Sequence, residues 1–313
     1  MNYIQILILA LIQGAAELLP ISSSAHVILA AKLMHLKSET SEFVFLLVML
    51  HTGTMFAVIY YFWPRWRWLF SAAHPSPYTA ISRGQFLKMI VLATACTGVL
   101  GLALKYFIEK VVLMGMLHRD KAEVEDLFES LPLIAVSLFA VGIFIIVAGF
   151  AATRRLGGML SSPMPTGSGL SSGSGGESIA PRLSRRTTVW IGLIQGLCLP
   201  FRGFSRSGAT ISMALVCGTE RKLAEDFSFA LAVVLTPPVI GRGLYRLLRD
   251  ANADSHILDL LVPGIVGMGL SFVAGLLALK VLSAALEKGH WQYFGYYCIF
   301  ASLIVLAAAI QGY

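Results

Sequence analysis

The stretch from Gln195 to Thr210, QGLCLPFRGFSRSGAT, interrupts an apolar region with proline, glycine, serine and arginine. A weaker form of the same pattern, QGAAELLPISSSAH, runs from Gln13 to His26. Proline and glycine break helices, so each stretch predicts one helix that ends inside an apolar region and a second that follows it. At membrane depth, the backbone groups freed by such a break must be satisfied by protein or by a polar cavity. The two stretches therefore predict a polar site inside a membrane protein.

The composition of the whole chain sets the surroundings of these stretches. Of 313 residues, 57% are hydrophobic and 13% are charged, which is typical of a polytopic α-helical membrane protein. The apolar N-terminus has neither a basic region nor a cleavage motif, so we expect it to stay in the protein. Basic loops beside membrane helices account for the net charge of +7, and no nucleic-acid partner is expected. The four cysteines form no CxxC pair, so neither a disulfide framework nor a zinc site is predicted.

Apolar segments recur along the chain, and a full membrane span needs about 20 residues. The segments lie at about 1–19, 43–62, 86–107, 131–151, 187–201, 208–218, 227–247, 260–282 and 291–312. Two neighbouring segments, 187–201 and 208–218, are too short to cross separately. The first segment is likewise followed by a short second arm, SSSAHVILAAKLM. Each of these pairs predicts a re-entrant hairpin that enters the membrane and returns.

Short motifs repeat in the same order in the two parts of the chain. They are LIQG at 11–14 and 193–196, LP at 19–20 and 199–200, EFVF and DFSF at 42–45 and 226–229, and LALK at 102–105 and 277–280. This order predicts a single membrane domain, 1–313, made of related halves at 1–151 and 187–313 with a flexible linker at 152–186. Each half would hold one hairpin and about three transmembrane helices. An odd number of crossings would give the second half an inverted topology, with a site near the membrane midplane.

The charges of the loops predict the orientation of the chain. The loop at 63–85 and the linker at 152–186 are rich in arginine, whereas the loop at 108–130 is rich in Asp and Glu. Positively charged loops lie preferentially in the cytoplasm. We therefore expect both termini outside, the first hairpin entering from the outer face and the second from the cytoplasmic face.

The first broken stretch carries a carboxylate and several hydroxyl groups. Gln13 and Glu17 lie four residues apart, so they share one face of a helix. A carboxylate in the membrane is costly without a cationic partner. The hydroxyl groups after Pro20 belong to Ser22, Ser23 and Ser24, with His26 close behind as a base. Serines at a helix break are often caps, which is the structural alternative for Ser22, Ser24 and, in the second stretch, Ser207.

The second broken stretch has the residues of a phosphate site. Arg202 and Arg206 flank Gly203, and glycine leaves backbone N–H groups accessible. A helix that starts near Ser207, with Arg206 beside it, would cradle an anion. Further hydroxyl groups come from Ser205 and Thr210. Together the two stretches predict phosphoryl chemistry on an anionic substrate, with a divalent ion between Glu17 and the phosphates supplying the cation.

The two stretches resemble the signature motifs of the undecaprenyl-pyrophosphate phosphatase family of the bacitracin-resistance type, E/Q-x-x-x-E and P-G-x-S-R-S-x-x-T. The likeness continues through FVFLLVMLHTGTMFAV, EDFSFALAVVL and FVAGLLALKVL. It implies a bacterial inner-membrane enzyme that hydrolyses undecaprenyl pyrophosphate to the monophosphate and phosphate, with its active site facing the periplasm. Such an enzyme recycles the lipid carrier of peptidoglycan synthesis and confers resistance to bacitracin, which acts on the same lipid. The oligomeric state, for instance a homodimer, stays open.

The resemblance also implies roles for individual residues. Gln13 and Glu17 match the metal-binding pair, for Mg²⁺ or Ca²⁺, and Ser23 and His26 match the serine and histidine after the proline. Residues matched or assigned to substrate binding are Ser22, Arg202, Gly203, Ser205, Ser207 and Thr210. We hypothesise that Ser23 attacks the terminal phosphorus with His26 as base, while Arg206 and the Glu17-bound cation neutralise charge. His26 as the nucleophile is an open variant.

Two departures from the family pattern concern the site. Gln13 replaces a carboxylate at the first metal position, which the E/Q pattern allows and which could weaken metal binding. LPFRGFSRSG displaces Pro200 from the usual Pro-Gly and inserts Arg202, an additional candidate phosphate contact. His51, within an apolar span, is interpreted as structural or cavity-lining.

A lipid-phosphate transporter or flippase is the main alternative function, because broken helices in inverted repeats are also a transporter architecture. A channel or structural protein would not need this set of residues.

Overall fold

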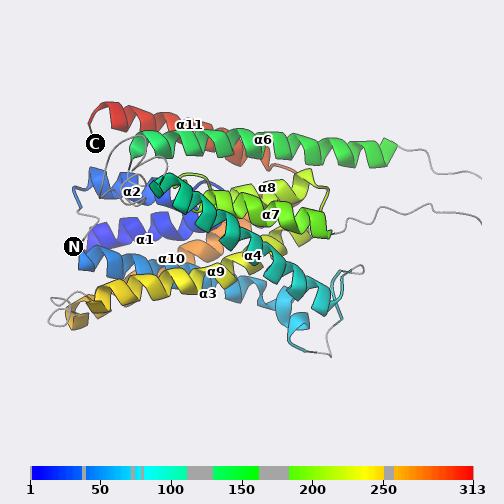
Figure 1. The fold of residues 1–313 in the computed structure, drawn as a ribbon. Helices are drawn as coiled ribbons and strands as arrows, with labels where there is room; N and C mark the ends of the chain where they lie inside the picture. Colours follow the sequence, from blue (N-terminus) through cyan, green and yellow to red (C-terminus); the bar gives the residue numbers. More distant parts are fainter. Residues whose placement is uncertain are drawn as a thin grey trace, which may run out of the picture.

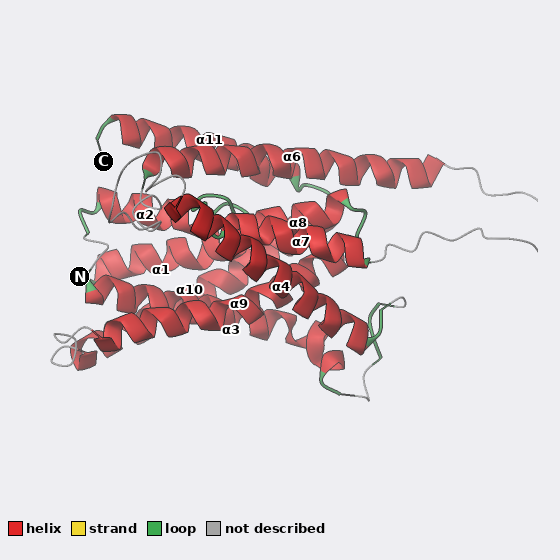
Figure 2. Ribbon diagram, in the orientation of Figure 1, coloured by secondary structure: helices red, strands yellow, loops and turns green. Residues whose placement is uncertain are grey.

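A computed structural model describes residues 2–36, 40–71, 75–78, 81–110, 130–161, 183–249 and 257–312. This part of the chain is helical and contains no strand (Figure 2). The first half contains α1 (Tyr3–Leu18), α2 (Ser23–Leu33), α3 (Ser41–Trp66), the 3₁₀ turn η1 (Arg67–Leu69), α4 (Arg83–Phe107) and α6 (Leu131–Ser161). The second contains α7 (Arg185–Cys198), α8 (Arg206–Val216), α9 (Arg221–Arg249), α10 (Ile257–Glu287) and α11 (Gln292–Ile310).

Six of the described helices, α3, α4, α6, α9, α10 and α11, are long and apolar enough to cross a membrane. Each coincides with one of the spans predicted from hydropathy. The helices α1, α2, α7 and α8 are shorter, with 16, 11, 14 and 11 residues. For the residues that the structure describes, the prediction of an all-helical protein is therefore confirmed, and the six long apolar helices fit a multi-pass membrane protein.

Both predicted helix breaks are present, and local chemistry explains where they fall. The helix α1 ends just before Pro20, and α2 begins after Ser22, whose hydroxyl accepts a hydrogen bond from the backbone N–H of Ala25. The helix α7 likewise ends before Pro200. Ser205 then caps α8 by accepting a hydrogen bond from the backbone N–H of Gly208 at 3.3 Å. Proline prevents each first helix from continuing, and a serine cap starts each second one.

The two short helix pairs approach each other from opposite ends of the bundle (Figure 1). The pair α1 and α2 lies toward the end that holds both chain termini, whereas α7 and α8 lie toward the other end. Around them, α1 packs on α10 and α7 packs on α4, while α3 contacts α9 and α6 contacts α11. The turns of the two pairs meet in the interior of the bundle, where the side chain of Arg206 reaches Glu17.

A second polar cluster joins α3 to the start of α9. Arg65 contacts the carboxylates of Glu225 at 2.8 Å and Asp226 at 3.0 Å, and both acidic side chains are almost completely buried. Tyr78 donates a hydrogen bond to Asp226. Arg65 was expected to be a positive charge of the loop at 63–85, but it lies within α3 and its charge is neutralised by this pair. The acidic part of the loop at 108–130 and most of the linker at 152–186 lie outside the described residues.

The turn before α8 depends on Gly203. Its φ is +106°, a backbone conformation that residues other than glycine rarely adopt. A Cβ atom at this position would also lie 2.5 Å from the backbone oxygen of Ile134. We expect Gly203→Ala to destabilise the protein by about 2 kcal/mol, because it adds both backbone strain and a backbone clash. The thermal unfolding midpoint in detergent would measure this. Gly98→Ala in α4 is the control, since nothing lies within 4 Å of that position; equal midpoints for both variants would contradict the expectation.

Candidate active site

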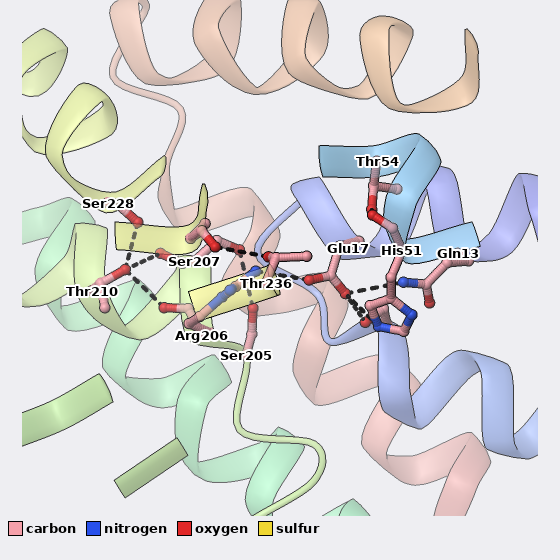
Figure 3. Close-up of polar contacts among 12 residues, drawn as sticks. Gln13, Glu17, His51, Thr54, Ser205, Arg206, Ser207, Thr210, Ser228 and Thr236 are labelled. Carbon is pink, nitrogen blue, oxygen red and sulfur yellow. Dashed lines mark hydrogen bonds and ion pairs between the residues drawn. The ribbon is translucent and has the colours of Figure 1, made fainter. Parts of the chain in front are cut away.

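An ion pair joins the two broken stretches. The Nη2 atom of Arg206 lies 2.7 Å from Oε1 of Glu17, and the two side chains are 24% and 17% exposed (Figure 3). The two residues are 189 positions apart in the sequence. The expectation that Glu17 has a cationic partner is met by Arg206 itself. A divalent ion is therefore not required to balance this carboxylate.

The second carboxylate oxygen of Glu17 accepts hydrogen bonds from its own half of the chain. The Ser23 hydroxyl donates to Oε2 at 2.5 Å, and the Gln13 amide donates to the same atom at 3.2 Å. Gln13 and Glu17 thus share one face of α1, as their spacing predicted. The structure brings together the carboxylate, a serine hydroxyl and a guanidinium group at one point.

His51, on α3, is a fourth neighbour of Glu17, after Arg206, Ser23 and Gln13 (Figure 3). Its Nε2 atom lies 3.9 Å from Oε2 of Glu17, and its Nδ1 atom lies 2.8 Å from the backbone oxygen of Leu47. A carbonyl oxygen only accepts hydrogen bonds, so Nδ1 carries a proton and Nε2 faces the carboxylate. His51 was interpreted as structural or cavity-lining, and the structure places it beside Glu17. The available signal was an ionisable residue within an apolar span, which is a functional candidate by default.

Two helix N-termini add positive electrostatic potential at this point. Ser23 is the first residue of α2 and Arg206 is the first residue of α8, and both contact Glu17. The N-terminus of a helix carries a partial positive charge and unsatisfied N–H groups, which favour anions. With Arg206 beside them, these helix ends suit a bound phosphate. The predicted helix start near Ser207 is confirmed.

The hydroxyl groups of the second stretch are buried and hold the turn together. Ser207 donates to the backbone oxygen of Leu19 at 3.3 Å, which links the two turns directly. The Thr210 hydroxyl lies 2.8 Å from the backbone oxygen of Arg206, to which it donates, and 2.6 Å from the Ser228 hydroxyl on α9. Ser205 caps α8, Gly203 packs against Ile134, and Arg202 is half-buried in the same turn. In this structure the serine and threonine side chains therefore support Arg206 from within the protein.

His26 lies apart from the contacts of Glu17. Its Nδ1 atom is 2.7 Å from the backbone oxygen of Ser22, and its Nε2 atom is 2.8 Å from the hydroxyl of Tyr297 on α11. The Ser23 hydroxyl is directed at Glu17 instead. Sequence reasoning placed His26 next to Ser23 and overlooked Tyr297, because residues 271 positions apart share no local pattern.

The oxygen atoms near Glu17 are of the type that a hard divalent cation prefers. Within the described ranges, no group of three or more His, Cys, Asp or Glu side chains is arranged to hold a metal ion. Gln13 and Glu17 nevertheless provide an amide and a carboxylate oxygen. Mg²⁺ commonly takes one or two carboxylates and completes its shell with water and substrate phosphates. Gln13 and Glu17 supply only two such oxygen atoms, so a divalent cation at this point would need further ligands from water or from a phosphate group.

The fold and the site define a class: multi-pass helical membrane proteins in which two broken helices bring a carboxylate, a hydroxyl and a guanidinium group together inside the bundle. Such a site suits a phosphorylated substrate. The family model described as "Bacitracin resistance protein BacA" matches residues 6–304. The chain therefore belongs to this family.

Curated relatives match over nearly the full length of the chain. Undecaprenyl-diphosphatase 2 of Acinetobacter baylyi is 47% identical over 99% of this chain and 99% of its own length. Undecaprenyl-diphosphatase 1 of the same organism is 30% identical over 98% of this chain and 95% of its own. Undecaprenyl-diphosphatase of Korarchaeum cryptofilum is also 30% identical, over 98% of this chain and 99% of its own.

Proposed function

We propose that this protein is an integral membrane phosphatase that hydrolyses undecaprenyl pyrophosphate to undecaprenyl phosphate and inorganic phosphate. Membership of the family and the names of full-length relatives support this substrate. The observation that carries the proposal is the contact of Glu17 with both the Ser23 hydroxyl and the Arg206 guanidinium group. This arrangement provides a nucleophile, a proton acceptor and a charge for phosphate at one point. In the cell the reaction would recycle the lipid carrier and confer bacitracin resistance.

In the proposed reaction, the Ser23 hydroxyl oxygen attacks the terminal phosphorus and its proton passes to Glu17. The bond between this phosphorus and the bridging oxygen breaks, and undecaprenyl phosphate leaves. Water then attacks the phosphorus of the phosphoserine, the bond between phosphorus and the Ser23 oxygen breaks, and Glu17 returns its proton to that oxygen. Inorganic phosphate leaves with the oxygen and the protons of the water. Arg206 and the N-termini of α2 and α8 stabilise the negative charge on the transferring group.

Glu17, rather than His26, is the base for Ser23 in this proposal. The hydrogen bond from the Ser23 hydroxyl to Oε2 of Glu17 is 2.5 Å long, the length of a charge-assisted hydrogen bond to a carboxylate, so the proton to be removed already faces Glu17. Both ring nitrogens of His26 contact other groups, namely Ser22 and Tyr297. The same contacts disfavour the variant in which His26 is the nucleophile. Of the remaining residues assigned to substrate binding, Ser22 caps α2, and those of the second stretch support Arg206 or line its turn.

The proposed membrane arrangement is an inverted repeat of 1–151 and 187–313 around two re-entrant hairpins. The opposite approach of α1–α2 and α7–α8 supports it (Figure 1), as do the matching contacts of α1 with α10 and α7 with α4. The turn at η1 and the end of α6 lie at the end of the bundle away from both termini. With the basic loops in the cytoplasm of a bacterial inner membrane, the termini face the periplasm, and the substrate enters from that side.

Phosphate release by purified protein tests the function against the transporter alternative. We expect the detergent-solubilised protein to release inorganic phosphate from undecaprenyl or farnesyl pyrophosphate, with the prenyl monophosphate as the other product. A transporter would bind or move the lipid without changing it. Binding of the lipid by folded protein without phosphate release would therefore contradict the phosphatase and favour a transporter.

We further propose that Gln13 and Glu17 hold Mg²⁺ or Ca²⁺ together with the pyrophosphate, and the cation would neutralise phosphate charge. EDTA is expected to reduce phosphate release, and added Mg²⁺ to restore it. Gln13→Glu adds a carboxylate and should lower the Mg²⁺ concentration needed for half-maximal activity, whereas Gln13→Leu should raise it. Identical Mg²⁺ dependence in the wild type and both variants would contradict a metal site at Gln13.

A further inference from the structure

The last helix of the chain contacts the turn that carries Ser22 and Ser23 through two adjacent side chains. The Tyr297 hydroxyl lies 2.8 Å from Nε2 of His26, and the two rings stack with centroids 5.7 Å apart and planes 12° apart. The next residue, Cys298, donates a hydrogen bond to the backbone oxygen of Pro20 at 3.3 Å. The helix α11 therefore contacts both Pro20, at the start of this turn, and His26, in the first turn of α2.

The hydrogen bonds of His26 determine which ring nitrogen carries its proton. Nδ1 lies 2.7 Å from the backbone oxygen of Ser22, which can only accept, so Nδ1 is the donor. In the neutral ring, Nε2 then accepts the hydrogen bond from the Tyr297 hydroxyl. Tyr297 thus stabilises the one tautomer that can hold the Ser22 carbonyl. No ring nitrogen remains available to accept the proton of Ser23.

Ser22 needs such a restraint because its backbone is strained. Its φ is 68° and its ψ is 97°, in a region that residues other than glycine rarely adopt. Strained residues of this kind persist only where surrounding contacts determine them. Ser22 directly precedes Ser23, so the conformation of Ser22 fixes the direction from which the Ser23 hydroxyl meets Glu17.

We propose that Tyr297 is a positioning residue for phosphate release. Through His26 it holds Ser22 in its strained conformation and so keeps the Ser23 hydroxyl against Glu17. His26 is then also a positioning residue. This inference rests on the proposed role of Ser23, and it adds a requirement for the C-terminal helix to the chemistry of the N-terminal stretch.

Substitutions of His26 separate positioning from proton transfer. In His26→Asn, the side-chain amide N–H can replace the Nδ1 donor to Ser22, but it cannot act as a base. We expect His26→Asn to keep kcat within about 10-fold of the wild type, and His26→Ala to lose about 100-fold, the effect of a misplaced reacting group. KM should change little in both. The pH profile of kcat/KM in His26→Asn should keep both limbs of the wild-type profile.

Tyr297→Phe tests the hydroxyl directly, because it retains the ring stacking. We expect kcat to fall about 10-fold with KM nearly unchanged. In the His26→Ala background the same substitution should have no further effect, since its partner is already absent. Tyr296→Phe, on the same helix, is the matched control and should leave kcat unchanged. Thermal unfolding midpoints in detergent would identify variants that lose activity through unfolding.

Some results would overturn the proposal. His26→Asn as inactive as His26→Ala, with a limb of the pH profile lost, would make His26 the base. Additive losses in Tyr297→Phe and His26→Ala would show that the two residues act separately. Failure of the underlying site is distinguishable, because a Ser23→Ala variant with full activity would remove the role of Ser23 whatever happens at Tyr297.

Discussion

Replacing Ser23 with alanine is expected to reduce phosphate release more than about 1,000-fold, the scale seen when a catalytic nucleophile is removed. The hydroxyl that donates to Glu17 at 2.5 Å would be absent, so no phosphoserine could form. Initial rates of phosphate release, normalised to folded protein, would measure the loss. KM should change little, because Arg206 and the helix N-termini remain in place to bind the substrate.

Ser24→Ala is the matched control for this prediction. Ser24 is the next residue in α2, and we expect its removal to leave the rate largely unchanged. A rapid-quench experiment with substrate labelled in the terminal phosphate should recover label on Ser23 in the wild type and none in Ser23→Ala. If Ser23→Ala hydrolyses the lipid at the wild-type rate, water attacks the phosphorus directly and the covalent route is wrong.

Replacing Arg206 with alanine is expected to cost about 1,000-fold in phosphate release, because a guanidinium group that neutralises a transferring phosphoryl group contributes on this scale. The same change also leaves the Glu17 carboxylate without its cation, so stability should fall. Arg206→Lys should recover part of the stability and less of the activity, since an ammonium group cannot bind phosphate through two parallel donors.

Two further variants separate the catalytic loss from the loss of stability. The double variant Glu17→Gln/Arg206→Met removes both charges, so it leaves no unpaired carboxylate. We expect it to be inactive but to unfold at a higher temperature than Arg206→Ala. Arg65→Ala breaks the buried ion pair with Glu225 and Asp226 instead, and should lower stability while the folded fraction keeps its kcat. Equal activity per folded molecule in Arg206→Ala and Arg65→Ala would contradict the role of Arg206 in the reaction.

Most of the fold could be predicted because its signals are local. Hydropathy identified the six spans, and the proline and glycine residues near Pro20 and Gly203 identified the two breaks. These features depend on the preference of each residue for lipid and on its backbone dihedral angles. Arg65 was assigned to a loop because the apolar run ends near it; only the packing of α3 on α9 gives it its acidic partners.

The sequence predicted which residues belong to the candidate site better than it predicted which of these residues contact one another. The spacing of Gln13 and Glu17 gave their common face, and the Gly/Ser surroundings of Arg206 indicated an anion site. The hydrogen bonds of Ser23 and His26 could not be read in this way. Ser23 lies near His26 in sequence, yet its hydroxyl meets Glu17, while His26 meets Tyr297.

By itself, the sequence of this protein determined a polytopic helical chain, two helix breaks inside it and the residue types that the breaks carry. Only the tertiary structure decided that Arg206 is the cation of Glu17, that His51 approaches the same carboxylate, and that α11 holds the turn before Ser23. The physical reason is the separation in sequence of the residues that interact. Helix starts and ends follow from short-range backbone preferences, whereas pairs separated by 189 or 271 residues depend on how the helices pack.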